Sequence, residues 1–201
     1  MFKFDLSQEP LSSRELQAEL TTLKNLRKDQ IKQSCISDVL HAFVFIGLYF
    51  SHFLSGYSVL IAVAISTVFA LVMAMISRER LLLTDKLAIA FIALGTAAAT
   101  TLILTIIMKE EIIGSLVAGL TTGSIVIVGA TLGRRIKQVM ITLDEMKPII
   151  DDEQSLQEIT KFCRQHPQLD TYRELAAQNL RPHLTYGELA AMRKWDEDNK
   201  L

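Results

Sequence analysis

Four polar side chains recur at helical spacing in and beside the first apolar stretch of the chain, and their types suit the handling of ions or protons. They are Asp38, His41, His52 and Ser55. On a helix they fall within about a third of the circumference. Polar groups at membrane depth are costly, and they commonly line a packed interior, a water-filled path or a proton relay. This intramembrane polar stripe therefore predicts helix packing or an interfacial position, with ion or proton handling as the alternative.

The spacing within the stripe limits its chemistry. His41 and His52 are about 16 Å apart along a helix that rises roughly 1.5 Å per residue, which is too far to share one metal ion. Asp38 and His41 are three residues apart and can pair on one helix face. The sequence contains no HExxH, GxxxxGK[ST], GxGxxG or GxSxG motif. We therefore expect no catalytic residues, no cofactor and no metal site, and an intramembrane enzyme is the least favoured class.

The elements that must position these groups are long apolar runs in the middle of the 201-residue chain. The runs extend over Val39 to Leu54, Val59 to Ile76, Leu87 to Met108 and Ile112 to Leu132. Each is close to the roughly 17 to 25 residues that cross a bilayer as a helix. The predicted fold class is therefore an all-α membrane protein with four transmembrane helices, a cytosolic N-terminal amphipathic helix and a small C-terminal cytosolic helical domain.

Basic residues cluster at alternate breaks between these runs, and this pattern predicts the topology. The clusters are Lys24, Arg27, Lys28 and Lys32, then Arg78, Arg80 and Lys86, and finally Arg134, Arg135 and Lys137. Since Lys and Arg are enriched on the cytoplasmic side, both termini are expected there. We expect a multi-pass protein of a bacterial inner (plasma) membrane. Cys35 and Cys163 fall on the same reducing side and match no zinc or redox spacing, so free thiols are expected.

The predicted fourth span gathers small residues on one face. They are Gly114, Ser115, Ala118, Gly119, Thr122, Gly123, Gly129 and Gly133. The pairs Gly119 with Gly123 and Gly129 with Gly133 have the spacing of close helix crossings. This face predicts packing against another helix of the same chain, with a homo-oligomer seam or a pore wall as alternatives. In the third span, threonine hydroxyls can bond to carbonyls of their own helix.

The two polar ends carry helix-start patterns of the capping-box type, Ser12 with Glu15 and Thr185 with Glu188. Leu16, Leu20 and Leu23 give the arm an apolar face that is expected to rest on the membrane or on the rest of the protein, with docking of a partner as the alternative. The expected domains are an arm at 1–36, a transmembrane domain at 37–133, a helical stalk at 134–148 and a helical domain at 149–201. The last has about 50 residues and should lean on a neighbour.

Charge excludes one class of partner. The chain holds 21 Lys and Arg against 22 Asp and Glu, so it lacks the cationic excess that direct nucleic-acid binding needs. We expect an integral membrane interaction or scaffold protein that oligomerises through its small-residue faces and presents cytosolic helices to cytosolic or membrane protein partners. The alternative is an oligomeric small channel or transporter with a pore lined by the first or fourth span.

Overall fold

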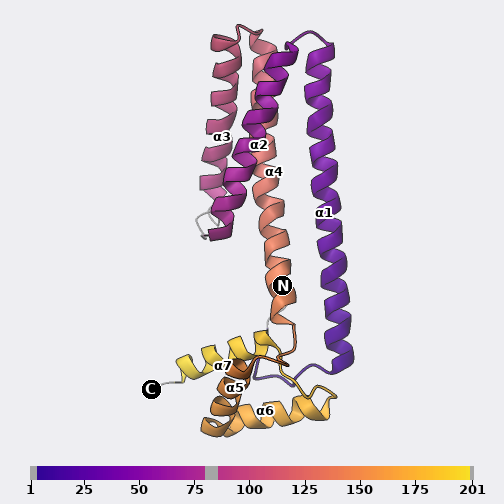
Figure 1. Cartoon of the computed structure of the whole chain (residues 1–201), viewed down its shortest axis with the longest axis vertical. Coiled ribbons are helices and arrows are strands. Elements are labelled where there is room, and N and C mark those ends of the chain that lie inside the picture. Colours follow the sequence, from indigo (N-terminus) through magenta and orange to yellow (C-terminus); the bar gives the residue numbers. More distant parts are fainter. Residues whose placement is uncertain (1–3, 80–85, 200–201) are drawn as a thin grey trace. The chain divides into compact units, whose positions relative to one another are not determined.

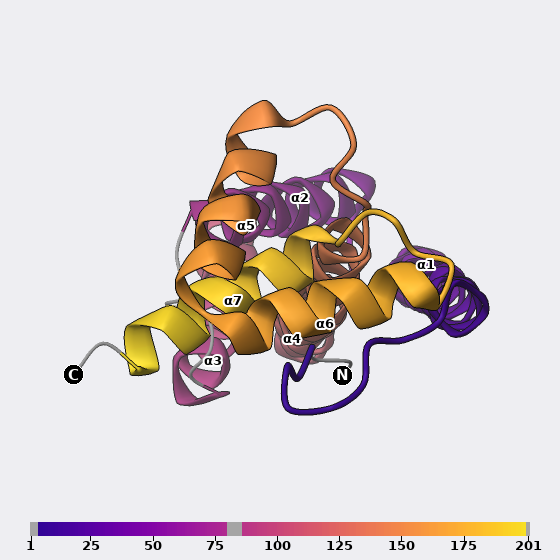
Figure 2. The ribbon, with the colours of Figure 1, turned by 90° about the horizontal axis from the view of Figure 1, so that it is seen from below.

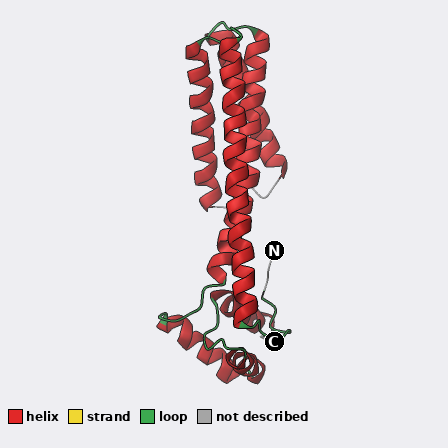
Figure 3. Cartoon of the chain, turned by 90° about the vertical axis from the view of Figure 1, so that its right-hand side faces the viewer, coloured by secondary structure: helices red, strands yellow, loops and turns green. Residues whose placement is uncertain are grey.

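The computed structural model describes residues 4–79 and 86–199, and their regular elements are all helices (Figures 1 and 3). In chain order these are α1 (Ser13–Phe50), α2 (Gly56–Glu79), α3 (Lys86–Leu102), the π-helix η2 (Ile103–Ile107), α4 (Ile112–Glu145), α5 (Glu153–Gln165), α6 (Pro167–Gln178) and α7 (Tyr186–Asp198). Within the described ranges, strand pairing is limited to an isolated bridge between Pro148 and Thr185.

The chain divides into two compact units. The first, here called the end unit, consists of Met1–Lys28 and Lys137–Leu201. The second, here called the bundle unit, is Asp29–Ile136. Helices α1 and α4 contribute residues to both, because α1 is one helix of 38 residues and α4 one helix of 34. No break separates the predicted arm from the predicted first span, and the predicted continuation of the fourth span beyond the bundle is confirmed.

Three helices are long and apolar enough to cross a membrane, and they indicate a membrane protein. They are Ser13–Phe50, Leu87–Ile107 and Ile112–Glu145. Within the described part of α2, only the shorter stretch Gly56–Phe69 qualifies as an apolar helix, so the fourth span stays a prediction. The same holds for the topology, because Arg80 lies outside the described residues and the side chains of Arg78 and Lys86 are not described either.

The core of the bundle unit combines large and small apolar side chains from α1, α2, η2, α4 and the connection after α1. One buried cluster contains Phe45, Leu48, Leu54, Ala62, Leu104 and Ala118. On α3, the hydroxyls of Thr96 and Thr100 donate to the carbonyls of Ile92 and Thr96, at 2.7 and 2.9 Å. The predicted self-satisfaction of these threonines is therefore confirmed, and it lets a polar face pack without water.

In the end unit, α5, α6 and α7 enclose one apolar core (Figure 2). Phe162, Leu169, Leu189 and Met192 are among its buried members, and Trp195 packs against them partly buried. Helix α5 ends where predicted, since His166 precedes Pro167 and takes an extended backbone. The Thr185–Glu188 capping box opens α7, and Ser12 and Glu15 form the same motif before α1. Both predicted boxes are confirmed.

The apolar face of the arm also packs inside the end unit. Leu16, Leu20 and Leu23 of α1 meet Val139, Leu143 and Met146 at the end of α4, and the side chains of Leu23, Val139 and Met146 are buried. The apolar face of the arm was expected to rest either on the membrane or on the rest of the protein. The structure shows it on the rest of the protein, against the end of α4.

Candidate functional site

A cleft of about 320 Å³ lies among α1, α2 and α4 of the bundle unit. Its lining consists of Asp38, His41, Ala42, Phe45, Val63, Ser66, Thr67 and Ile125. The volume is at the lower end of the range of small-molecule sites, roughly 300 to 1,000 Å³, and such sites commonly lie between helices of bundles. The structure thus brings two residues of the predicted polar stripe, Asp38 and His41, to one cavity.

The imidazole of His41 is held by hydroxyls on both of its nitrogens. Nε2 lies 3.1 Å from Oγ of Ser124 on α4, and Nδ1 lies 3.4 Å from Oγ of Ser37. Because a hydroxyl can donate or accept, this arrangement suits either neutral tautomer. Among the described residues, no ion pair joins His41 to Asp38, so the pairing that the spacing allows is replaced by contacts to serine.

Asp38 differs from its neighbours in the cleft because its carboxylate is exposed and has no hydrogen-bond or ion-pair partner within the described part of the chain. The hydroxyls beside it are occupied. Ser66 donates to the carbonyl of Ala62 at 2.8 Å, and Thr67 donates to the carbonyl of Val63 at 2.9 Å. Their oxygens keep lone pairs that can accept a further hydrogen bond.

The other two residues of the stripe lie beyond the end of α1. His52 adopts a left-handed backbone with φ of 61° in the connection to α2. Ser55 lies at the start of α2, where its hydroxyl accepts from the amide of Ser58 at 3.3 Å. The structure therefore separates His52 and Ser55 from the Asp38 and His41 cleft.

Ser55 and Ser58 instead meet Glu110, a residue that sequence reasoning missed. The amide of Ser55 and the hydroxyl of Ser58 donate to Glu110 Oε1 at 3.1 and 2.6 Å. These bonds, first from Ser55 and then from Ser58, hold the pKa of Glu110 below its ordinary value. The two connections they join lie at the same end of the bundle (Figure 1). The sequence contained two indications of this contact. The first backbone amides of α2 need acceptors from outside their helix, and Glu110 is an acidic residue in another connection.

The small-residue face of α4 has two parts, which differ in whether other residues of the chain pack against them. A Cβ added at Gly119 would collide with Thr101 Oγ1 and the carbonyl of Ala97 on α3, and one at Gly123 would lie 2.9 Å from the carbonyl of Ala93. A Cβ at Gly114 would collide with the carbonyl of Phe53, and Ser115, Ala118 and Thr122 are fully buried. A Cβ at Gly129 or Gly133 would meet no atom of the described residues within 4 Å. One part of the face thus packs within the chain, and the Gly129–Gly133 part is open.

The most deeply buried charges of the end unit are Arg181 and Glu188, whose side chains are 4% and 0% exposed. Arg181 Nη2 donates to both carboxylate oxygens of Glu188, at 2.6 Å to Oε1. The hydroxyl of Tyr172 donates to Oε1 at 2.9 Å, and the amide of Thr185 donates to Oε2 at 2.8 Å. Burial and the adjacent Glu188 carboxylate raise the pKa of Tyr172. The bonds from Tyr172 and Thr185 to the carboxylate offset part of the cost of burying the pair, while the Nε of Arg181 has no partner within the described residues.

Arg181 also joins the two sequence segments of the end unit. Its Nη1 donates to the carbonyl of Leu11 at 2.9 Å, and Asn179 Nδ2 donates to the carbonyl of Pro10 at 3.0 Å. Leu6 packs against the core of α5 to α7. The prediction that the C-terminal helices lean on a neighbour is therefore confirmed, and that neighbour includes the N-terminal arm.

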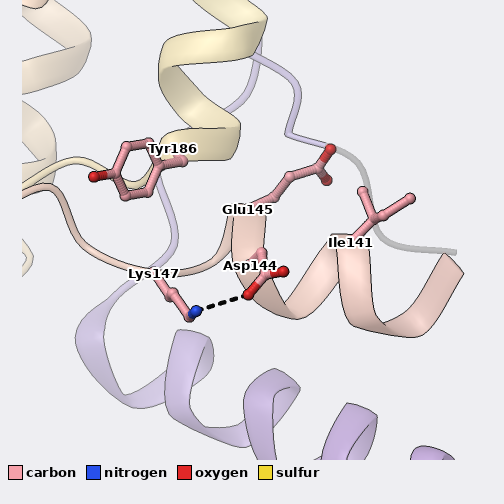
Figure 4. Close-up of a pocket in the computed structure, with 5 residues that line it drawn as sticks. All are labelled: Ile141, Asp144, Glu145, Lys147 and Tyr186. Carbon is pink, nitrogen blue, oxygen red and sulfur yellow. Dashed lines mark ion pairs between the residues drawn. The ribbon is translucent and has the colours of Figure 1, made fainter. Parts of the chain in front are cut away.

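A second cavity, of about 430 Å³, lies in the end unit where α4 ends and α7 begins (Figure 4). Its lining comprises Ile141, Asp144, Glu145, Lys147 and Tyr186, and we call it the Tyr186 groove. Lys147 Nζ lies 2.7 Å from Asp144 Oδ1, with both side chains well exposed. The hydroxyl of Tyr186 donates to Asp152 Oδ2 at 3.3 Å.

Comparison with known proteins places the chain beside none of them: no family model, no curated protein and no solved structure matches it. Within the described residues, no group of three or more His, Cys, Asp or Glu side chains is placed to hold a metal ion. Cys35 and Cys163 are free thiols. Any functional assignment must therefore come from the two cavities and the surfaces around them.

Proposed function

We propose that this chain is a membrane-anchored interaction protein whose bundle unit holds it in the bilayer and whose end unit docks a protein partner. The observation that carries the proposal is the buried Arg181–Glu188 pair with its bond to Leu11. Such a pair fixes the relative positions of the arm, α6 and α7. A fixed surface binds with less loss of conformational entropy than a flexible one.

The Tyr186 groove is the proposed docking place. Tyrosine is enriched among the residues that dominate binding energy at interfaces. Tyr186 lines the groove together with the acidic residues Asp144 and Glu145, and Lys147 is the one basic residue among the described lining. This balance suits a partner segment that carries a lysine or arginine beside an apolar residue, since the apolar part can contact Ile141 and the cation can reach a carboxylate.

The finer features of the anchor belong to the same proposal. We infer four spans, both termini on the cytoplasmic side and a bacterial inner membrane, on the basis of the four apolar runs and the alternating basic clusters. We also infer self-association, through Gly129 and Gly133. These two glycines are the part of the small-residue face on which no described residue packs.

Photo-crosslinking in living cells tests the docking proposal. A benzophenone amino acid replaces Tyr186 in the full chain, and the crosslinked product is identified by mass spectrometry. The matched control places the same amino acid at Gln168, an exposed residue of α6 outside the groove. We expect one protein partner captured at 186 and not at 168, and at least tenfold less of it when Asp144 and Glu145 are both changed to lysine. Equal capture from both positions, or capture that survives the charge reversal, contradicts the proposal.

The alternative, an oligomeric channel or transporter with a pore lined by the first or fourth span, draws on the exposed Asp38 carboxylate of α1. Under this alternative, Asp38→Asn or His41→Ala alters ion flux through the protein in reconstituted liposomes. Unchanged flux in both variants removes it.

A further inference from the structure

The cleft of the bundle unit offers hydrogen-bond acceptors to a ligand. The Asp38 carboxylate has no partner within the described residues, and the hydroxyl protons of Ser66 and Thr67 are used on carbonyls of their own helix. The nitrogens of His41 are occupied by Ser37 and Ser124. A ligand that complements this end of the cleft must bring N–H or O–H donors and, opposite Asp38, a positive charge.

The rest of the lining is apolar. Ala42 and Phe45 follow Asp38 and His41 along α1, while Val63 and Ile125 come from α2 and α4. The described lining carries neither lysine nor arginine, so an anion would face Asp38 without a counter-charge. An entirely apolar ligand would leave that carboxylate desolvated and unpaired, which is costly. A bare divalent cation would find one carboxylate where it requires about six oxygen ligands.

We propose that this cleft binds a small organic ammonium ion with one short alkyl tail, the ammonium on Asp38 and the tail along Phe45, Val63 and Ile125. The cleft measures about 320 Å³, at the lower limit of small-molecule sites. This size suits one short chain rather than the paired acyl chains of an aminophospholipid. The site is independent of the docking function, because its residues all lie in the bundle unit.

Equilibrium dialysis of radiolabelled octylamine tests the proposal, using the full-length protein in a neutral detergent and subtracting uptake by empty micelles. We expect saturable binding of about one octylammonium per chain and at least tenfold weaker binding to Asp38→Asn. The matched control is Asp29→Asn, which removes the same charge from the same helix outside the cleft lining and should bind as the wild type does. Octanol, which has the tail without the charge, should not displace the probe.

A second variant guards against a folding defect in Asp38→Asn. Ala42→Phe fills the cleft without changing its charge and should also abolish binding, while thermal unfolding shows that the variant is folded. Wild-type binding by Asp38→Asn, wild-type binding by Ala42→Phe, or equal competition by octanol would each overturn the proposal. Displacement by short-chain phosphatidylethanolamine but not by phosphatidylglycerol would assign the cleft to a lipid headgroup and likewise overturn it.

Discussion

In the bundle unit, α4 meets α3 through residues with almost no bulk, whereas the end unit closes over a full ion pair. In the bundle unit, Gly119 and Gly123 let α4 approach the backbone of α3, and the threonines there satisfy their hydroxyls on their own helix. In the end unit, the carboxylate of Glu188 accepts from Arg181, Tyr172 and Thr185. The contrast teaches that the bundle unit is sensitive to added volume and the end unit to a lost charge.

The largest expected effect comes from removing one partner of the buried pair. Glu188→Ala leaves the Arg181 guanidinium buried without its counter-charge and removes the α7 capping box. We expect the end unit to lose about 3 to 5 kcal/mol of unfolding free energy. Urea unfolding followed by the fluorescence of Trp195 measures it, because Trp195 is the single tryptophan and packs on the core of the end unit.

The matched control for this variant is Glu158→Ala. It breaks the Arg193–Glu158 ion pair of 2.6 Å, whose side chains are 52% and 28% exposed. Exposed pairs contribute less than about 1 kcal/mol. A loss as large as that of Glu188→Ala would contradict the conclusion that the buried pair stabilises the end unit more than an exposed pair does.

Added volume should act on the bundle unit at one glycine and not at another. Gly119→Ala puts a methyl group against Thr101 and the Ala97 carbonyl, and such overpacking costs about 1 to 3 kcal/mol. Gly129→Ala introduces the same group where no described atom lies within 4 Å and should leave the fold unchanged. Thermal unfolding in detergent, followed by far-ultraviolet circular dichroism, measures both variants.

Trp195 emission in the Gly119→Ala melt sharpens the comparison. A Trp195 midpoint equal to that of the wild type, beside a lowered bundle midpoint, shows that the two units unfold separately. Equal shifts of both signals would merge them into one cooperative unit and break the contrast.

The smallest expected effect concerns pH and Glu110. Because its pKa is lowered in the folded state, Glu110 stabilises the bundle unit above its ordinary value near 4.5, and this contribution is lost as the pH falls through the lowered pKa. The group is partly exposed, so solvent screening limits the effect to less than about 1 kcal/mol. Glu110→Gln should flatten the decline of the bundle melting temperature between about pH 5 and pH 3.

Glu111→Gln is the control for that measurement, since it leaves the Ser55 and Ser58 bonds to Glu110 in place. An acid decline as steep in Glu110→Gln as in the wild type would show that other carboxylates account for it.

Local patterns in the sequence predicted the local structure. Ser12 with Glu15 and Thr185 with Glu188 are three residues apart, so the geometry of one helix turn fixes their contacts. The helical period of apolar residues across 112–145 likewise predicted an uninterrupted helix, because that period is also a local property of the sequence. These predictions needed no knowledge of which helices are neighbours.

The tertiary partners could not be predicted in this way. Glu188 was identified as a capping residue, but its ion pair with Arg181 depends on the turn between α6 and α7, where Leu180 takes a left-handed backbone with φ of 59°. The small-residue face of α4 was recognised, yet its pattern does not say that α3 covers Gly119 and leaves Gly129 open. The predicted stripe grouped His52 with His41 because it assumed one helix through residue 55, whereas α1 ends at Phe50.

The hydrogen bond from Arg181 to the Leu11 carbonyl also sets the order of events during synthesis. Its partners are separated by 170 positions, and at about 5 to 20 residues per second a ribosome needs roughly 8 to 34 s to make the chain between them. All the long apolar helices are translated within that interval. The N-terminal arm therefore lacks its contacts with Arg181 during that interval. The end unit can fold completely only after the last of these helices has been made.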